Sequence, residues 1–205
     1  MIAIIDYGAG NLHSVQNALS FLGAESIITG NKEQILNADK MILPGVGAFG
    51  DAMACLREAK LDTVAAEAEA LDIPLLGICL GLQLLFEGSA ESPGVRGLGL
   101  FKGACRRIPQ REHLKIPHIG WNSLEITKES KLLHGLGDAP YVYFVHSYYL
   151  QAKDPKIVAA TTEYGVTIHA SVEKENVFAC QFHPEKSSKT GLAILKNFLA
   201  QRREG

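Results

Sequence analysis

The sequence predicts an α/β fold with a mostly parallel central sheet flanked by helices and an antiparallel extension in the C-terminal half. Three observations support this prediction. Continuous apolar runs, such as residues 2–5 and 75–78, suit strands that are buried on both faces. In residues 1–90 such runs alternate with apolar residues at helical spacing, which is typical of a parallel sheet with right-handed crossovers. From about residue 95 strand-like segments follow one another closely, between glycine-rich turns.

The first predicted strand, residues 2–5, leads through a glycine-containing loop into a helix. The apolar face of that helix is expected to consist of Leu12, Val15, Leu19 and Leu22. Asn11 can cap the helix and Gly23 can end it. Gly8-Ala9-Gly10 is similar to the start of a dinucleotide-binding fingerprint. The third glycine is missing, so a tight strand-to-helix turn is the better interpretation.

The next segments continue the alternation of strands and helices. We expect strands at residues 26–29, 40–43 and 74–78, and helices at residues 32–38, 51–60 and 62–70. A glycine-rich loop, residues 44–50, follows the strand at residues 40–43. Ligands of open α/β sheets bind at the carboxyl ends of the strands. This loop is therefore a candidate part of a binding site.

The strand at residues 74–78 runs into the pattern Gly-x-Cys-x-Gly, with Cys79 at its centre. This is the layout of a nucleophile elbow, a sharp turn that presents one side chain at the start of the next helix. Gly77 and Gly81 allow the strand and helix backbones to approach closely. The partial positive charge of a helix N-terminus favours the thiolate that a cysteine nucleophile needs. A buried cysteine in an ordinary strand-to-helix turn is the alternative interpretation.

Strand-like segments fill most of the C-terminal half. We expect strands at residues 104–108, 123–126, 141–144, 157–162, 167–172 and 177–182. They are interpreted as an antiparallel extension of the same sheet plus hairpins. A final helix at residues 190–202 carries apolar residues at helical spacing. No low-complexity linker and no internal repeat divides the sequence, so residues 1–205 are expected to form a single domain.

Composition and charge argue against several classes of function. The formal net charge of −2 gives no electrostatic footprint for nucleic acid and no polybasic patch for membranes. The four cysteines are spread out without a CxxC pair, which indicates reduced thiols. The first residues lack the basic leader of a signal peptide, and the apolar stretch at residues 73–86 is too short to span a bilayer. We therefore expect a cytoplasmic protein.

A possible base for Cys79 lies near the end of the chain, where a predicted strand runs into His183-Pro184-Glu185. Pro184 disfavours the α region for His183, and in extended geometry His183 and Glu185 share a face. Glu185 could then accept a hydrogen bond from one imidazole nitrogen and leave the other to face the thiol. Cysteine, histidine and carboxylate would form a nucleophilic triad, which is recognised by roles and geometry rather than by chain order.

Less specific interpretations of these residues exist. His183 could be an ordinary histidine at the end of a strand, and Glu185 a solvated carboxylate. Cys180 and His183 could be half of a metal site, but the sequence holds no second ligand pair at suitable spacing, so no metal is expected. His146 also follows a predicted strand, at a place where a site could be.

Three of these motifs together resemble the class I (triad) glutamine amidotransferases. They are residues 77–83 around Cys79, the loop at residues 44–47 and the His183-Pro184-Glu185 segment. The resemblance covers essentially the whole chain, and the motifs occur in the family's order and spacing. Further segments resemble the glutaminase subunits of imidazole glycerol phosphate synthases, namely residues 6–11, 43–49, 117–122, 143–148 and 181–187. The family implies a flavodoxin-like sheet.

The resemblance implies hydrolysis of glutamine to glutamate and ammonia, without a cofactor. In this scheme Cys79 attacks the side-chain amide, and His183, oriented by Glu185, transfers the protons. Two backbone amides are candidate oxyanion donors: that of Leu80 by elbow geometry, and that of Val46 by resemblance. The positions that match the family's glutamine-binding residues are Gly47, Gln83, Ser147 and Tyr148.

The resemblance also implies a partner, a (β/α)8-barrel cyclase subunit that forms a heterodimer with the glutaminase and consumes the ammonia. In the family's reaction PRFAR is converted to imidazole glycerol phosphate and AICAR, within histidine biosynthesis. The docking face is expected around the mouth of the active site. Its candidate contacts are Asn11, Trp121, Tyr141 and Lys186. A position in the core is the alternative interpretation of Trp121.

Other functions remain open at this level. The chain could be the glutaminase of another triad enzyme, such as a pyridoxal phosphate, anthranilate or guanylate synthase. It could be a cysteine hydrolase or chaperone-like protein on a related α/β fold, although such proteins usually lack a His-Pro-Glu ending. It could also be a non-catalytic binding subunit, against which the intact Cys79, His183 and Glu185 argue.

Overall fold

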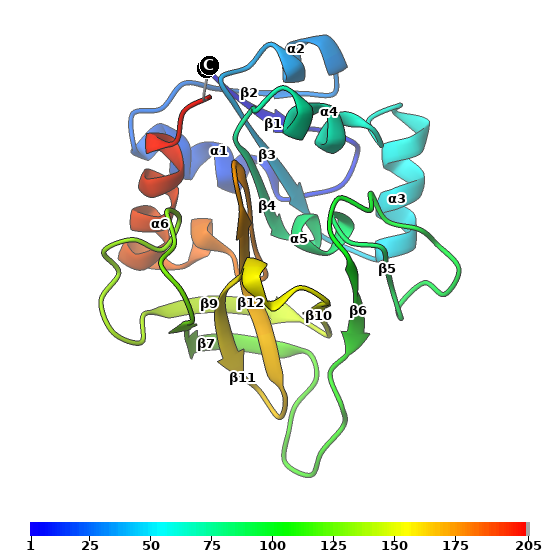
Figure 1. Ribbon diagram of the computed structural model, residues 1–205, viewed down its shortest axis with the longest axis vertical. Helices are drawn as coiled ribbons and strands as arrows, with labels where there is room; N and C mark the ends of the chain where they lie inside the picture. Colours follow the sequence, from blue (N-terminus) through cyan, green and yellow to red (C-terminus); the bar gives the residue numbers. More distant parts are fainter. Residues whose placement is uncertain (204–205) are drawn as a thin grey trace.

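The computed structural model describes residues 1–203. Within this range an eight-stranded sheet in the order β2-β1-β3-β4-β13-β12-β11-β8 forms the centre of the molecule, and helices lie on both sides of it (Figure 1). Its first five strands are β2 (Ser26–Thr29), β1 (Ile2–Ile5), β3 (Lys40–Gly45), β4 (Leu75–Cys79) and β13 (Val177–Cys180). These five are parallel, and the first four confirm the parallel sheet predicted for the N-terminal half.

The parallel strands are buried because successive side chains point to opposite faces of the sheet and both faces are covered. In β1, Ala3 and Ile5 belong to one core cluster, whereas Ile2 and Ile4 belong to the other. The side chains of β13 divide between the two clusters in the same way. Burial on both faces explains why these strands are continuously apolar in sequence.

Six α-helices within residues 1–203 cover the two faces. The first core cluster is covered by α2 (Lys32–Leu36), α3 (Phe49–Glu58), α4 (Val64–Ala70) and α5 (Leu80–Leu84). The opposite face is covered by α1 (Leu12–Phe21) and α6 (Ser188–Ala200), which lie on the left in Figure 1 while α3 and α4 lie on the right. Five of them occur in the segments where helices are expected, with ends shifted by a few residues, and α5 is the helix expected after the elbow.

The two ends of α1 differ in how well the sequence predicts them. Gly23 ends the helix as expected: its φ is +75°, and its amide donates to the carbonyl of Ser20 while that of Ala24 donates to Leu19. Asn11 precedes the helix, but its side chain makes no capping hydrogen bond. Its ψ of 63° lies outside the extended region from which a cap side chain reaches back to the first turn.

The C-terminal half extends the sheet with antiparallel strands, as predicted. β12 (Thr167–Lys174) pairs with β13, followed by β11 (Val158–Glu163) and β8 (Glu125–Ile126). The other strands lie outside the large sheet, where the sequence led us to expect hairpins without assigning their partners. β10 (Tyr148–Ala152), β6 (Gly103–Arg107) and β5 (Gly88–Ser89) form a three-stranded sheet, and β7 (His118–Ser123) pairs with β9 (Tyr141–His146). Sequence spacing identifies a strand but not its partner.

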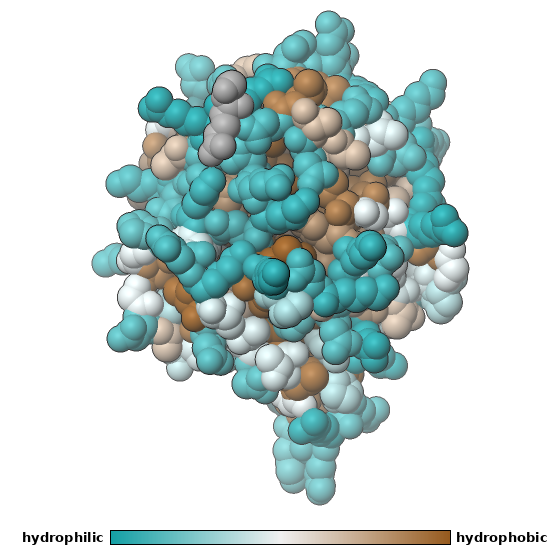
Figure 2. Space-filling model, viewed as in Figure 1, coloured by the Kyte–Doolittle hydropathy of each residue, from teal (hydrophilic) through white to brown (hydrophobic). Residues whose placement is uncertain are grey.

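The surface shown in Figure 2 is covered mostly by hydrophilic residues, with smaller apolar patches between them. No helix in residues 1–203 is both long enough and apolar enough to cross a membrane. The four cysteines are free. In the same range, no cluster of three or more His, Cys, Asp and Glu side chains is arranged to hold a metal ion.

Candidate active site

The turn between β4 and α5 holds Cys79 in a strained conformation. Its φ is +55° and its ψ is −108°, a combination that L-residues rarely adopt and that often marks a functional site. The flanking glycines have no room for a side chain. A Cβ on Gly81 would lie 1.9 Å from the carbonyl oxygen of Leu43, and one on Gly77 would lie 3.0 Å from the carbonyl carbon of Gly81. The elbow predicted from the flanking glycines is confirmed.

His183 and Glu185 lie beside the elbow, directly after β13. His183 Nδ1 is 2.8 Å from Glu185 Oε1, and both side chains are almost completely buried. His183 is extended, as expected for a residue before proline. Glu185 is not extended, because Pro184 begins a short 3-10 helix, Pro184–Lys186. The pair therefore forms across a turn, not along a strand as the sequence suggests.

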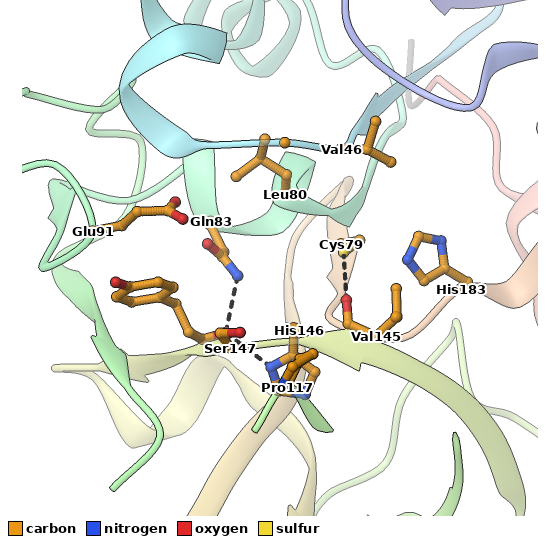
Figure 3. Close-up of a pocket in the computed structure, with 12 residues that line it drawn as sticks. Val46, Cys79, Leu80, Gln83, Glu91, Pro117, Val145, His146, Ser147 and His183 are labelled. Carbon is orange, nitrogen blue, oxygen red and sulfur yellow. Dashed lines mark hydrogen bonds between the residues drawn. The ribbon is translucent and has the colours of Figure 1, made fainter. Parts of the chain in front are cut away.

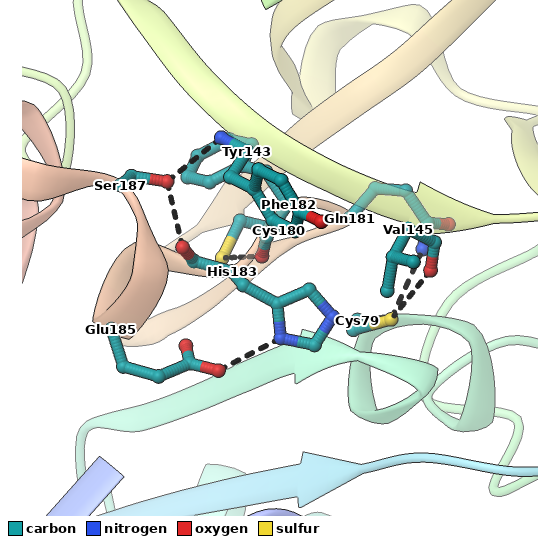
Figure 4. Close-up of polar contacts among 9 residues, drawn as sticks. All are labelled: Cys79, Tyr143, Val145, Cys180, Gln181, Phe182, His183, Glu185 and Ser187. Atoms are coloured by element: carbon teal, nitrogen blue, oxygen red, sulfur yellow. Dashed lines mark hydrogen bonds and ion pairs between the residues drawn. The ribbon is translucent and has the colours of Figure 1, made fainter. Parts of the chain in front are cut away.

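The second imidazole nitrogen of His183 faces the thiol of Cys79 (Figure 4). This Nε2 is buried and has no hydrogen-bond partner among the described residues. Burial alone would lower the pKa of His183, but its interactions with Cys79 and Glu185 outweigh burial and raise the pKa to about 10. The histidine is thus placed to take a proton from the sulfur and to hold it as an imidazolium.

Strand β9 contacts both the histidine and the cysteine (Figure 4). The His183 amide donates to the carbonyl of Tyr143 at 2.9 Å. The Tyr143 amide donates to Ser187 Oγ at 2.9 Å, and that hydroxyl donates to the His183 carbonyl at 2.7 Å. The thiol of Cys79 lies 3.9 Å from the carbonyl oxygen of Val145. β9 thereby contacts both the nucleophile and the base.

A cavity of about 280 Å³ opens above the thiol, a size suited to a small molecule. It is lined by Val46, Gly47, Cys79, Leu80, Gln83, Glu91, Pro117, Val145, His146, Ser147, Tyr148 and His183 (Figure 3). The two predicted oxyanion residues and the four predicted substrate-binding residues all lie in this lining. Their contacts with a substrate are still a prediction.

Tyr7 is bonded to the end of β3, directly before the glycine-rich loop. The Tyr7 hydroxyl donates to the Pro44 carbonyl at 2.9 Å, and burial raises the pKa of this phenol, which keeps it protonated as a donor. Val46 is 43% exposed at the mouth of the cavity, and Gly47 has a φ of +96° that favours glycine. Gly45 pairs with Cys79 across β3 and β4, so the loop begins beside the elbow.

The amide nitrogen of Gln83 is bonded within the protein, although the family resemblance makes this residue a substrate contact. Its Nε2 donates to the carbonyl of Tyr148 at 3.1 Å and to Gln181 Oε1 at 3.0 Å. Both protons of the amide nitrogen are thus used within the protein. Any contact between Gln83 and a substrate has to be made by its remaining oxygen or its backbone.

Sequence reasoning missed Glu91 and did not show how His146 is held. Glu91 is the single carboxylate of the lining, and its Oε2 accepts a hydrogen bond from the Phe49 amide at the start of α3. No motif surrounds it, so nothing in the sequence separates it from a surface glutamate. His146 Nδ1 lies 2.8 Å from the carbonyl oxygen of Tyr148. Because a carbonyl only accepts, this nitrogen carries the proton.

His146 in the cavity lining is in contact with a second buried histidine, His118. His118 Nδ1 lies 3.1 Å from His146 Nε2. Burial lowers the pKa of His118 to about 4 and that of His146 to about 3. Both are therefore neutral at physiological pH, and neither competes with His183 as a base. The sequence placed His146 near a possible site, and it does line the cavity.

The predicted docking residues fall into two groups. Trp121 and Tyr141 are 51% and 58% exposed on the same face of the β7–β9 sheet, together with Ile119 at 58%. The alternative interpretation, that Trp121 belongs to the core, is wrong. Asn11 is half-buried and Lys186 is exposed, and neither lies on that sheet.

Comparisons with known proteins agree with this geometry. The family model described as glutamine amidotransferase class-I matches residues 3–202. The imidazole glycerol phosphate synthase subunit HisH of Bacillus cereus strain G9842 is 52% identical over 97% of this chain and 93% of its own length. The subunit of the same name from Caldanaerobacter subterraneus is 51% identical over 97% of both chains.

Solved structures support the fold. The structure of PurLQS from Thermotoga maritima superposes with a TM-score of 0.76 at 21% identity, over 97% of this chain and 96% of that one. A crystal structure of a glutamine amidotransferase gives a TM-score of 0.75 at 20% identity, with the same coverage. The family match spans nearly the whole chain, and the elbow cysteine, histidine and glutamate meet at one cavity. This chain belongs to the class I glutamine amidotransferase family.

Proposed function

We propose that this chain is the glutaminase subunit of an imidazole glycerol phosphate synthase and that Cys79, His183 and Glu185 are its catalytic triad. The observation that carries the proposal is the position of His183, with one nitrogen 2.8 Å from Glu185 and the other facing the thiol of Cys79. The relatives named HisH, about half identical in sequence over nearly full length, support the choice of synthase.

The reaction begins with a proton transfer from Cys79 to His183. The thiolate attacks the side-chain amide carbon of glutamine, and the backbone amides of Val46 and Leu80 stabilise the oxyanion. Collapse of this intermediate breaks the carbon–nitrogen bond, while His183 protonates the leaving nitrogen and ammonia departs. His183 then takes a proton from water, which cleaves the thioester and releases glutamate.

The cavity provides groups for the rest of the substrate. The carboxylate of Glu91 is suited to the α-ammonium group of glutamine, because opposite charges attract strongly in a partly enclosed site. Gly47, Ser147 and Tyr148 line the cavity around it and offer backbone and side-chain hydrogen-bonding groups.

The ammonia is used by a partner, the cyclase subunit, which converts PRFAR to imidazole glycerol phosphate and AICAR. The exposed face of the β7–β9 sheet is the proposed docking surface, since Ile119, Trp121 and Tyr141 form an apolar patch there. Large exposed apolar side chains that lie together are typical of interfaces. Asn11 and Lys186 are proposed to contact the cyclase at the edge of the same region.

The decisive experiment is to measure glutamate release by the chain alone, with the cyclase, and with the cyclase plus its ligand. We expect weak activity alone and strong stimulation by the complete mixture. The Cys79→Ala variant should release no glutamate under any of the three conditions. Full activity of the lone chain would contradict the proposed dependence on the cyclase, and glutamate release by Cys79→Ala would contradict the triad.

A further inference from the structure

We propose that the side-chain amide of Gln181 is a further catalytic group, which donates a hydrogen bond to the sulfur of Cys79 and stabilises its thiolate. This inference rests on the proposed function of Cys79 as the nucleophile. Gln181 Nε2 lies 3.7 Å from Cys79 Sγ, within the range of an N–H···S hydrogen bond. The Gln181 residue is fully buried, so water cannot replace its amide as a donor.

The backbone holds Gln181 firmly at this place. The residue follows β13 directly, and its amide donates to the carbonyl of Ala170 on β12 at 2.8 Å. It stands two residues before His183, so the same strand end supplies both the base and the proposed thiolate donor. In Figure 4 Gln181 and His183 reach the sulfur from one segment of chain.

The orientation of the Gln181 amide follows from a chain of hydrogen bonds. Oxygen and nitrogen of an amide are told apart by their partners. The Tyr148 carbonyl can only accept, so Gln83 presents its nitrogen there. The same nitrogen lies 3.0 Å from Gln181, which must therefore present its oxygen to Gln83. The nitrogen of Gln181 is left to face Cys79.

The Tyr148 carbonyl, where this chain of hydrogen bonds begins, is held by a group that does not titrate near physiological pH. The Tyr148 carbonyl also accepts a hydrogen bond from His146 Nδ1 at 2.8 Å. Burial lowers the pKa of His146 to about 3, so this donor stays neutral and in place. The amide of Gln181 consequently keeps its direction at physiological pH.

Two groups beside the sulfur favour different protonation states of Cys79: the Val145 carbonyl favours the thiol, and the Gln181 amide favours the thiolate. The Val145 carbonyl oxygen, 3.9 Å from Sγ, can accept from a thiol but repels a thiolate. An amide N–H does the reverse, because a thiolate is the better acceptor. Gln181 therefore offsets Val145 and shifts the cysteine towards the form that attacks. A hydrogen bond to a charged group is typically worth a factor of about ten to a hundred in such an equilibrium.

Several other titratable groups face the same sulfur or its base. His183 and Glu185 come from the segment after β13, Cys180 from β13 itself, Tyr7 from the loop after β1 and His146 from β9. Burial raises the pKa of both Cys180 and Tyr7, which keeps these two neutral. A substitution of Gln181 leaves all five in the chain, so a changed alkylation profile does not come from the loss of one of them.

The test uses the full chain and the rate at which iodoacetamide alkylates Cys79, followed by peptide mass spectrometry as a function of pH. Gln181→Met keeps the side-chain length but removes the donor. We expect the pH of half-maximal alkylation to rise by about one unit or more and kcat to fall about ten- to a hundredfold. Gln181→Glu, which places a carboxylate near the sulfur, should raise that pH further.

Ser171→Ala is the matched control, because Ser171 is a fully buried polar residue that bonds to Ala179 and not to Cys79. It should leave the alkylation profile unchanged. An unchanged profile in a folded Gln181→Met or Gln181→Glu protein would overturn the inference. Alkylation needs no turnover, so a shifted profile in a chain that never hydrolyses glutamine would refute only the proposed function.

Discussion

The backbone amide of His183 donates a hydrogen bond to the carbonyl of Tyr143, 2.9 Å away. Tyr143 lies on β9 opposite Trp121 of β7, and the two rings pack at 6.0 Å. β9 also places the carbonyl of Val145 beside Cys79. The strand that carries the proposed docking face is thus bonded directly to the base and touches the nucleophile. A shift of β9 on docking would change both.

The hydroxyl of Ser187 closes the link between β9 and the base. Ser187→Ala leaves the partly buried Tyr143 amide without its acceptor, which typically costs about 1–3 kcal/mol of folding free energy. We expect kcat to fall about ten- to a hundredfold because His183 is less well positioned. Urea unfolding and glutamate release measure the two effects. Ser171→Ala should lose comparable stability without the loss of kcat, and equal kinetics in both variants would contradict this role.

Glu185 raises the pKa of His183 by stabilising the imidazolium. Glu185→Gln keeps a hydrogen-bond acceptor but removes the negative charge, so the pKa of His183 should fall from its raised value. The alkaline limb of the kcat/KM profile should then move to lower pH, and kcat should fall about 10²–10⁴-fold. NMR titration of labelled histidine reports the pKa directly. An unchanged His183 pKa would show that the carboxylate acts only by position.

The close approach at the elbow predicts unequal effects of two glycine substitutions. Gly81→Ala forces a Cβ to within 1.9 Å of the Leu43 carbonyl oxygen, so the protein should fail to fold or lose several kcal/mol. Gly8→Ala meets no atom within 4 Å and should cost only the strain of its φ of +88°, about 1–2 kcal/mol. Thermal unfolding of both variants decides, and a stable Gly81→Ala protein would be incompatible with this turn.

We expect Trp121, on the exposed face of the β7–β9 sheet, to contribute strongly to binding of the cyclase. Trp121→Ala should weaken binding by about 2 kcal/mol or more, since buried aromatic side chains dominate interfaces. The activity of the lone chain should change little, because Trp121 does not line the cavity. Leu71→Ala is the control: Leu71 is 44% exposed at the end of α4, which lies far from β7 and β9 in Figure 1. Titration calorimetry with the cyclase should show a loss only for Trp121→Ala.

Much of the fold follows from local sequence patterns. The apolar runs of β1 and β4 and the helical spacing around α1 and α6 are visible in the chain because burial on one or both faces dictates each residue in turn. The small sheets are a different case. β6 and β9 read as strands, but their partners are β10 and β7 rather than neighbours in the large sheet. Pairing depends on packing of whole layers, which no single segment encodes.

The candidate site also has features that the sequence reveals and features that only the tertiary structure reveals. The elbow at Cys79 and the histidine–glutamate pair are recognisable in sequence because each needs particular residues within a few positions: glycines for close approach, and a proline after the base. The contact of Gln181 with Cys79 joins residues 102 positions apart, and that of His183 with Tyr143 joins the segment after β13 to a strand of another sheet. Such contacts exist only once the strands have been ordered, because their partners are fixed by three-dimensional packing and not by spacing along the chain.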